Sequence, residues 1–284
     1  MEMEWIKQMN AAIDYIESQL TDSIDYEQLG RLTGCSSYQF QRMFGYIAGV
    51  PLSEYIRRRK MSHAAVDLQN GEKVLDVALK YGYSSPTAFS RAFQSVHGLS
   101  PSQVKQETAV VKSYLPLTFK LTVKGVAEMN YRIEKKEAFR VIGFSCPMSN
   151  ELEENFKNIP LFWDKVVENG SLEQLEHLAE NSEPKGVLGV CSCVGEESNW
   201  KYYIAAATEQ SADGMEEYEV PTATWAIFSG NCGEQPLSKA IQDLGQRVIT
   251  EWLPNSGYRY GNGPDLEVYL NDTDFEIWIP LIKK

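Results

Sequence analysis

One short motif occurs twice in the sequence, and its side chains could read DNA. The pattern Phe-x-Arg-x-Phe at residues 40–44 returns at residues 89–93, 49 positions later (91 − 42). Each copy follows a glycine suited to a tight turn, Gly34 in the first and Gly82 in the second. Arginine can form two parallel hydrogen bonds with guanine, and glutamine can do the same with adenine. The spacing therefore predicts two helices that each present an arginine to base edges.

Helical spacing separates the side chains that anchor each reading helix from those that face DNA. The two phenylalanines of each motif fall on one apolar stripe and should pack against a neighbouring helix. Proline offers only apolar contact, for example to a thymine methyl group, so sequence preference should depend more on the first helix than on the second. The side chains expected to face DNA are Tyr38, Gln39, Gln41 and Arg42 in the first helix and Pro86, Thr87, Ser90 and Arg91 in the second.

A less specific interpretation of these arginines is a surface salt bridge inside each unit. The basic run at residues 57–60 could likewise either contact DNA or form salt bridges. Successive helical residues point about 100° apart, so the run cannot face DNA as a whole. We expect one or two of its charges to contact phosphate and the others to be solvated or paired.

Helical patterns surround the repeated motif on both sides. Apolar residues recur at helical spacing in residues 5–16 and 53–68, and Asp25 offers an N-cap with Gln28 three residues later. The order is helix, turn, helix and connecting helix, and the same pattern begins again at Val74. This order predicts an all-α domain with two helix-turn-helix units in tandem.

Residues 1–108 resemble the DNA-binding domain of the AraC/XylS family of regulators. The resemblance implies that the two reading helices enter adjacent major grooves on one face of double-stranded DNA, about 34 Å apart. Two positions depart from the family pattern, because Gly30 stands where alanine is usual and Pro86 replaces a polar residue. The matching stretches are residues 33–44, 55–61, 77–83, 89–93 and 98–101.

A carboxylate in the second half of the sequence could bind a positively charged ligand. Glu267 shares one face of a predicted strand with Tyr269, while Val268 points to the other face. An ionised carboxylate beside aromatic rings suits an organic cation through charge pairing and cation–π attraction. Alternatively this face lies at a solvated edge and the aromatic residues belong to the core. The pattern alone leaves both interpretations open.

The elements expected around Glu267 alternate strands with helices. The order strand, helix, strand, strand occurs twice, which predicts an α+β domain of two similar halves over residues 131–284. Residues 109–130 lack periodicity and are expected to form a linker or connecting extension. The predicted strands are residues 140–145, 186–194, 200–208, 222–229, 266–270 and 275–279, and the predicted helices are residues 152–167 and 236–253.

Residues 139–284 resemble the GyrI-like ligand-binding domain, which occurs behind AraC-type readers and in multidrug-responsive regulators. The matching residues are 141–143, 162–163, the strand around Trp225, 266–269 and 275–280. The resemblance implies an effector pocket in which Glu267 is the acidic residue. It further implies Trp163, Tyr203, Trp225 and Tyr269 as walls of this pocket and Glu276 as a second acidic candidate.

Charge is distributed unequally along the chain. The 284 residues include 27 Lys/Arg and 39 Asp/Glu, for a net charge of −12. Residues 1–115 carry 12 basic and 12 acidic residues, so the whole excess of acid lies beyond residue 115. A neutral segment with clustered arginines can approach phosphate, whereas the acidic part should face away from DNA.

The cysteines and the N-terminal residues argue against several protein classes. The five cysteines contain no C-x-x-C pair, so neither a disulfide framework nor a zinc site is expected. Cys191 and Cys193 would share one strand face as reduced core residues. The chain opens without an export signal and contains no run of about 20 apolar residues. We therefore expect a cytoplasmic protein with no membrane segment, metal or cofactor.

These patterns together predict a sequence-specific regulator, an activator by the commoner family mode, that responds to a small cationic aromatic effector and has RNA polymerase as a further partner. Two alternatives stay open for the acidic domain. Glu267 and a nearby tyrosine could act as a general base and its partner in a hydrolase for electrophilic small molecules, or the domain could dock protein partners. Because no nucleophile motif such as G-x-S-x-G occurs, we expect no enzyme.

Overall fold

The computed structural model describes residues 4–105, 109–119, 128–149, 152–180, 182–193 and 199–283. These residues fall into two compact units: unit 1 is formed by residues 1–33 and 48–122, and unit 2 by residues 34–47 and 123–284. The predicted extension at 109–130 is therefore described only at 109–119 and 128–130, and the last residue of the predicted strand 186–194 lies outside the described residues.

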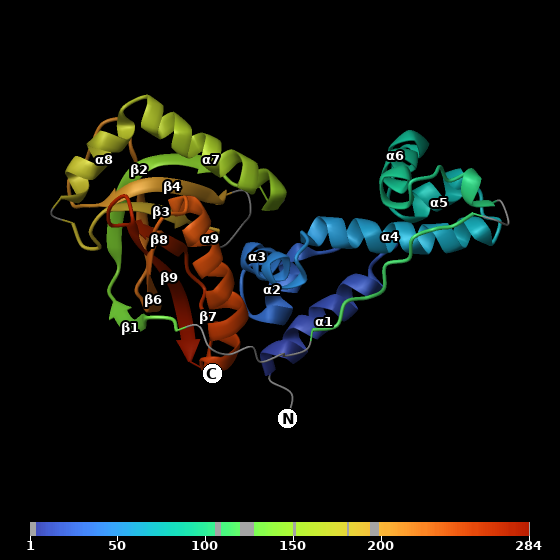
Figure 1. The fold of residues 1–284 in the computed structure, drawn as a ribbon, viewed down its shortest axis with the longest axis horizontal. Coiled ribbons are helices and arrows are strands. Elements are labelled where there is room, and N and C mark those ends of the chain that lie inside the picture. The colour runs from blue at the N-terminus through green and yellow to red at the C-terminus, as the bar shows by residue number, and fades with distance from the viewer. Residues whose placement is uncertain are drawn as a thin grey trace. The chain divides into compact units, whose positions relative to one another are not determined.

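Unit 1 is helical, as the sequence predicts, and its described residues contain no strand (Figure 1). Its α-helices are α1 (Glu4–Ser18), α2 (Tyr26–Thr33), α4 (Leu52–Gln69), α5 (Val74–Lys80) and α6 (Pro86–His97), followed by the 3-10 turn η1 (Gln103–Lys105).

Side-chain caps fix where the helices of unit 1 begin. The Asp25 carboxylate accepts the backbone N–H of Gln28 at 3.1 Å, which confirms the predicted cap of α2. The Ser85 hydroxyl accepts the backbone N–H of Thr87 at 3.2 Å, and Pro86 follows it in the first turn of α6, where no N–H is needed. The helix α6 ends at Gly98, whose φ of 80° is the left-handed conformation that glycine adopts readily.

The basic run at residues 57–60 is tied into unit 1. Its first two arginines pair with Glu54, and its terminal lysine donates to the carbonyl oxygen of Tyr81 at 3.3 Å. Arg59 is buried and forms an ion pair of 2.6 Å with Glu17 of α1. Arg59 and Lys60 therefore connect α4 to its neighbours, while the first two arginines pair within α4, as the paired alternative expects.

The segment 109–119 contains no helix or strand, but side chains of unit 1 accept hydrogen bonds from its backbone N–H groups. The backbone N–H of Tyr114 donates to the Ser62 hydroxyl at 3.0 Å, and that of Phe119 donates to the side chain of Asn10 at 2.8 Å. The first part of the predicted extension is thus a packed strap across α1 and α4.

Unit 2 is an α+β unit whose nine described strands form one antiparallel sheet (Figure 1). The strand order is β1-β6-β9-β8-β3-β4-β2-β5, and β7 also pairs with β9. The strands are β1 (Tyr131–Lys136), β2 (Phe139–Pro147), β3 (Val187–Cys191), β4 (Lys201–Ala207), β5 (Glu216–Val220), β6 (Ala223–Asn231), β7 (Tyr258–Tyr260), β8 (Asp265–Tyr269) and β9 (Asp274–Lys283).

The helices of unit 2 complete two similar halves. One half runs β2, α7, α8, β3, β4 and the other runs β6, α9, β8, β9, which confirms the predicted repeat of strand, helix, strand, strand. The unit also contains residues 37–47 of the helix α3. The helices are α3 (Ser37–Ala48), α7 (Leu152–Glu168), α8 (Ser171–Ala179) and α9 (Leu237–Arg247), and α9 continues into a π-helical turn η3 (Val248–Trp252) and a 3-10 turn η4 (Leu253–Asn255).

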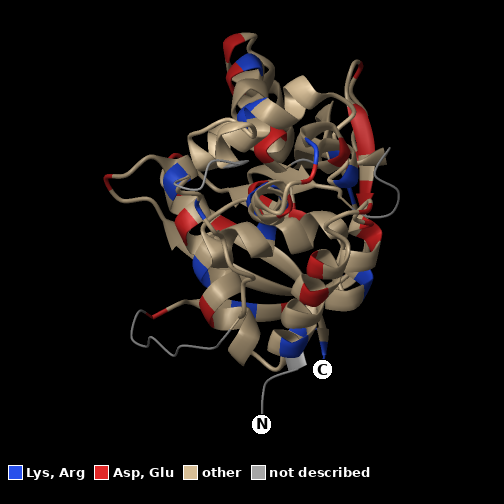
Figure 2. Cartoon of the chain, turned by 90° about the vertical axis from the view of Figure 1, so that its right-hand side faces the viewer, with Lys and Arg blue, Asp and Glu red and all other residues tan. Residues whose placement is uncertain are grey.

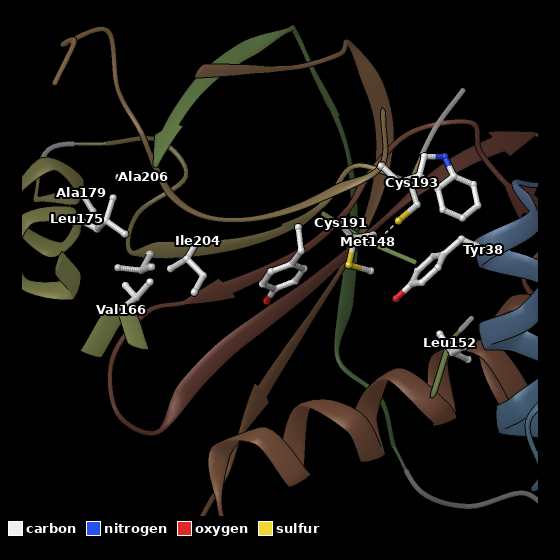
Figure 3. Close-up of a cluster of buried hydrophobic side chains, with 13 residues drawn as sticks. Tyr38, Met148, Leu152, Val166, Leu175, Ala179, Cys191, Cys193, Ile204 and Ala206 are labelled. Carbon is white, nitrogen blue, oxygen red and sulfur yellow. Dashed lines mark hydrogen bonds between the residues drawn. The ribbon is translucent and has the colours of Figure 1, made fainter. Parts of the chain in front are cut away.

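The two halves meet at the centre of the sheet, where β3 pairs with β8. Alternate residues of each strand point to opposite faces and join different clusters of buried side chains. One cluster lies between the sheet and α7 and α8, and it includes Tyr38 from α3 (Figure 3). The cluster on the opposite face contains Tyr203, Trp225 and Trp278.

Both charge signs are scattered over the ribbon rather than gathered into one block (Figure 2). Among the helices that the structure describes, none has the length and apolar character needed to cross a membrane.

Candidate functional site

A cavity of about 380 Å³ lies in unit 2 between one face of the sheet and three helices. Strands β3, β4 and β8 form its floor, and α3, α7 and α9 form its walls. Three of the predicted ligand-binding residues, Glu267, Tyr269 and Trp163, line this cavity together. Its volume suits a drug-sized molecule.

The Glu267 carboxylate is the polar centre of the cavity floor. It accepts hydrogen bonds from the hydroxyls of Tyr202 at 3.1 Å and of Tyr269 at 3.0 Å. The indole N–H of Trp163 in turn donates to the Tyr202 hydroxyl at 3.1 Å. Burial, together with the charge of Glu267, raises the pKa of both tyrosines well above the usual value, so both remain donors at neutral pH.

Aromatic rings surround this carboxylate. The Trp163 and Tyr269 ring centroids lie 4.8 Å apart. Gly189 of β3 lies directly opposite Glu267 in the strand register. A Cβ atom at Gly189 would lie 2.3 Å from the Tyr202 hydroxyl oxygen, so only glycine leaves room for the tyrosine to reach the carboxylate.

The other three predicted ligand-binding residues are not among those that line the cavity. Tyr203 and Trp225 belong to the cluster on the opposite sheet face. Glu276 accepts a hydrogen bond from Arg132 at 2.6 Å and one from the Trp278 indole at 2.8 Å. A shift of one position along a strand reverses the face, which is why Tyr202 lines the cavity and its neighbour does not.

Sequence reasoning missed Tyr202, and no sequence signal distinguishes it from Tyr203. Both are aromatic, adjacent and buried in β4. The strand pattern establishes that the two residues face opposite ways, but it does not say which face the helices cover.

Two residues predicted to read DNA, Tyr38 and Arg42, also line the cavity. The Arg42 guanidinium forms an ion pair of 2.8 Å with Asp265, in which the side chains are 15% and 6% exposed. The other Asp265 oxygen accepts a hydrogen bond from the Tyr260 hydroxyl at 2.5 Å. Burial raises the pKa of Asp265, and the Arg42 charge counteracts that rise.

The other reading residues of α3, Tyr38, Gln39 and Gln41, are buried as well. Tyr38 is 5% exposed and packs edge-on against Trp200, with ring centroids 6.0 Å apart. It extends from the helix toward Cys191 and Cys193, as Figure 3 shows, and these free thiols lie 3.2 Å apart as reduced core residues. Gln41 is 3% exposed, and its amide nitrogen has no hydrogen-bond partner among the described residues.

Gln39 has a structural role at the start of α3. Its side-chain oxygen accepts the backbone N–H of Ser36 at 3.0 Å, while the Ser36 hydroxyl accepts the backbone N–H of Gln39 at 3.2 Å. This reciprocal pair is a capping box. The side-chain nitrogen of Gln39 donates to the carbonyl oxygen of Gly263 at 3.3 Å. Its amide therefore has partners at both ends, all within unit 2.

The second predicted reading helix, α6, has different surroundings. Pro86, Thr87 and Arg91 are exposed, and Ser90 is half-buried. Phe89 and Phe93 are fully buried on the other side of the helix, with ring centroids 5.7 Å apart, as the predicted stripe requires. The predicted reading surface of this helix is thus open to solvent.

In the part of the chain that the structure describes, no group of three or more His, Cys, Asp or Glu side chains is placed to hold a metal ion.

Comparison with known families assigns both halves of the chain. The model of the Cass2 family, integron-associated effector binding proteins, matches residues 132–281, which is more than half of the chain. A helix-turn-helix domain model matches residues 29–107.

Individual relatives match the first half. The transcriptional activator AarP of Providencia stuartii is 39% identical over 89 residues, which are 31% of this chain and 66% of AarP. The regulatory protein SoxS of Salmonella typhimurium is 32% identical over 33% of this chain and 88% of SoxS. For the second half, the structure of SAV2435 bound to tetraphenylphosphonium aligns with a TM-score of 0.46 at 19% identity, over 54% of this chain and 94% of that chain.

Proposed function

Since the chain belongs to the integron-associated effector binding proteins through its second half and to the AraC-type DNA-binding transcription regulators through its first, we propose that it is an activator whose effector is an organic cation. The observation that carries this proposal is the Glu267 carboxylate inside an aromatic cavity.

The chemistry of the cavity favours a cation over a neutral or anionic ligand. The Tyr202 and Tyr269 hydroxyls donate hydrogen bonds to the Glu267 carboxylate. No arginine or lysine forms an ion pair with this carboxylate among the described residues, so its negative charge is not neutralised. A second carboxylate, Asp164, also lines the cavity. The Trp163 and Tyr269 rings provide aromatic surface for an organic cation, and cation–π attraction strengthens when water is excluded.

The DNA surface is proposed to consist of the reading residues of the two repeated helices. For α6 these are Pro86, Thr87, Ser90 and Arg91, which are exposed or half-buried in the structure. For α3 they are Tyr38, Gln39, Gln41 and Arg42, which read DNA once they are accessible. Activation, with RNA polymerase as a partner, is part of the same proposal.

Calorimetric titration of the full chain with tetraphenylphosphonium, a rigid aromatic monocation, tests the effector site. We expect saturable binding that Glu267→Gln weakens at least tenfold, or about 1.4 kcal/mol. The matched control is Glu234→Gln, which removes one negative charge at an exposed position of the same unit. Triphenylphosphine oxide, which is aromatic but neutral, should bind more weakly than the cation. Equal affinity of both glutamine variants for the cation would contradict the assignment.

Two further measurements test the rest of the proposal. Mass spectrometry of the cation after incubation should recover it unaltered, whereas turnover of reactive esters or epoxides by the chain would support the hydrolase alternative. A reporter gene behind a duplex selected by the chain should be transcribed more when the cation is added. Transcription that falls instead would show a repressor.

A further inference from the structure

We infer that unit 2 holds the first reading helix, α3, in a form that cannot read DNA, and that an organic cation in the cavity releases this helix by replacing Arg42 at Asp265. The inference rests on the proposed function, because it assigns the means by which the effector site controls the DNA surface. It uses contacts inside unit 2 alone.

The side chains that α3 would present to bases are largely buried, and two of them, Arg42 and Gln39, are also held by polar contacts. Arg42 pairs with Asp265, and the Gln39 amide is divided between Ser36 and Gly263. Tyr38 is buried against Trp200. The Arg42 side chain is only 15% exposed while it pairs with Asp265, so its guanidinium cannot reach a guanine edge from this position. The helix must therefore leave this position before it can read sequence.

Arg42 acts as a built-in cation of the cavity. Asp265 and Glu267 lie two positions apart on the same face of β8, which corresponds to about 7 Å along a strand. Arg42 neutralises the first carboxylate, and the second has no cationic partner among the described residues. An organic cation that enters for Glu267 and extends toward Asp265 therefore competes with Arg42 for the same negative charge.

A ligand in the cavity can reach the contact between Arg42 and Asp265, because both residues line the cavity. The ion pair lies at the cavity wall, and the Arg42 Nε also contacts the Tyr46 hydroxyl at 3.4 Å, a long hydrogen bond. The Gln41 amide nitrogen is buried without a partner among the described residues, and such a group costs about 1–3 kcal/mol. Release of α3 restores a partner to this amide, from water or from a base.

The helix α6 explains why the held form would keep some affinity for DNA. Three of its four reading residues, including Arg91, are exposed in the same structure. Weak binding through one helix and tighter binding through two would follow from the release of α3. A ligand shifts such an equilibrium only through its different affinities for the two forms, and here that difference arises at Asp265.

The first experiment removes the carboxylate that holds Arg42. Full-length chains are titrated against a duplex selected from a random pool by the wild-type chain, with fluorescence anisotropy as readout. Asp265→Asn should bind the duplex at least tenfold more tightly than the wild type. When unit 2 holds α3 in about nine-tenths of the wild-type molecules, only one-tenth can read DNA, and the apparent affinity is about tenfold lower. Glu234→Gln, which makes the same change in net charge at an exposed site, should change affinity far less.

The gain must also depend on Arg42. Adding Arg42→Ala to Asp265→Asn should abolish most of the increase, since the released arginine is what contacts the bases. Amide hydrogen exchange across residues 37–48 should be faster in the Asp265→Asn chain, which detects release without any DNA. An equal gain in Asp265→Asn and Glu234→Gln, or no change in either affinity or exchange, would overturn the inference.

The second experiment adds tetraphenylphosphonium to the same chains. The cation should raise the DNA affinity and the hydrogen exchange of residues 37–48 in the wild type, and it should have little further effect in Asp265→Asn. A cation that binds at Glu267 but changes neither quantity would refute the release while leaving the proposed effector site intact. A chain that binds neither the cation nor any selected duplex would refute the proposed function itself.

Discussion

The helices α3 and α6 carry the same Phe-x-Arg-x-Phe motif in opposite surroundings. Arg42 of α3 is paired with Asp265 and lines a cavity, whereas Arg91 of α6 is exposed. Both helices begin with a serine cap, Ser36 in one and Ser85 in the other. The local sequence thus determines the helix and its cap, while the surface that packs against the helix determines whether its side chains can reach DNA.

The largest difference is expected in the first turn of the two helices, which is buried in α3 and exposed in α6. Tyr38 and Thr87 are equivalent positions of the repeat, but only Tyr38 is part of a hydrophobic core. Tyr38→Ala should lower the free energy of unfolding by about 3 kcal/mol, because it leaves a cavity beside Trp200. Thr87→Ala should change it by less than about 0.5 kcal/mol. Urea denaturation of the two chains measures both values, and similar losses would remove the contrast.

The next contrast concerns sequence preference. Arg42→Ala should reduce discrimination between the best and the singly substituted duplexes by about 2 kcal/mol, and Arg91→Ala by less, because Pro86 limits the polar contacts of α6. Binding to a set of single-base variants of the selected duplex measures both effects. Equal losses would show that the two helices share the reading.

Accessibility of the two arginines can be compared directly by phenylglyoxal modification and peptide mass spectrometry. Arg91 should react about tenfold faster than Arg42, a difference of about 1.4 kcal/mol in effective barrier, because the ion pair and burial protect the latter. Saturation with tetraphenylphosphonium should narrow the difference between the two reaction rates, because the released Arg42 becomes accessible. Equal rates without ligand would mean that α3 is already free.

The smallest contrast is at the caps. Ser85→Ala and Ser36→Ala should each cost about 1 kcal/mol of stability, the usual value for an N-cap. Ser36→Ala removes the acceptor of the Gln39 backbone N–H and keeps the bond from the backbone N–H of residue 36 to the Gln39 side-chain oxygen. Thermal unfolding detects both losses, and a loss confined to Ser85→Ala would mean that contacts in unit 2 hold α3 in place of its cap.

Local patterns predicted most elements of the fold. The cap at Asp25, the turn glycine before each repeat and the two halves of the sheet follow from spacing and alternation. The strands β1, β5 and β7 and the helix α8 were missed. The strands β1 and β5 are short edge strands with mostly exposed residues. An edge strand has one neighbour and little burial, so its sequence shows only a weak apolar pattern.

The site was predicted in part. Alternation placed Glu267 and Tyr269 on one face, but it did not reveal that the helices cover that face, so Tyr203 was chosen over Tyr202. The pairing of Arg42 with Asp265 joins residues 223 positions apart. Nothing in a motif that is nearly identical in both copies distinguishes the buried helix from the exposed one.

The seam between β3 and β8 shows how two like halves can serve unlike purposes. At facing positions of this pair, one half contributes the carboxylate of Glu267 and the other contributes Gly189, whose missing side chain leaves room for the Tyr202 hydroxyl. Perfect symmetry would place either two charges or two gaps at the junction, and neither would make a binding site. In the proposed effector site, this unequal use of two facing positions supplies the recognition chemistry. Substitutions that make the two halves more alike at this point should abolish cation binding before they disturb the fold.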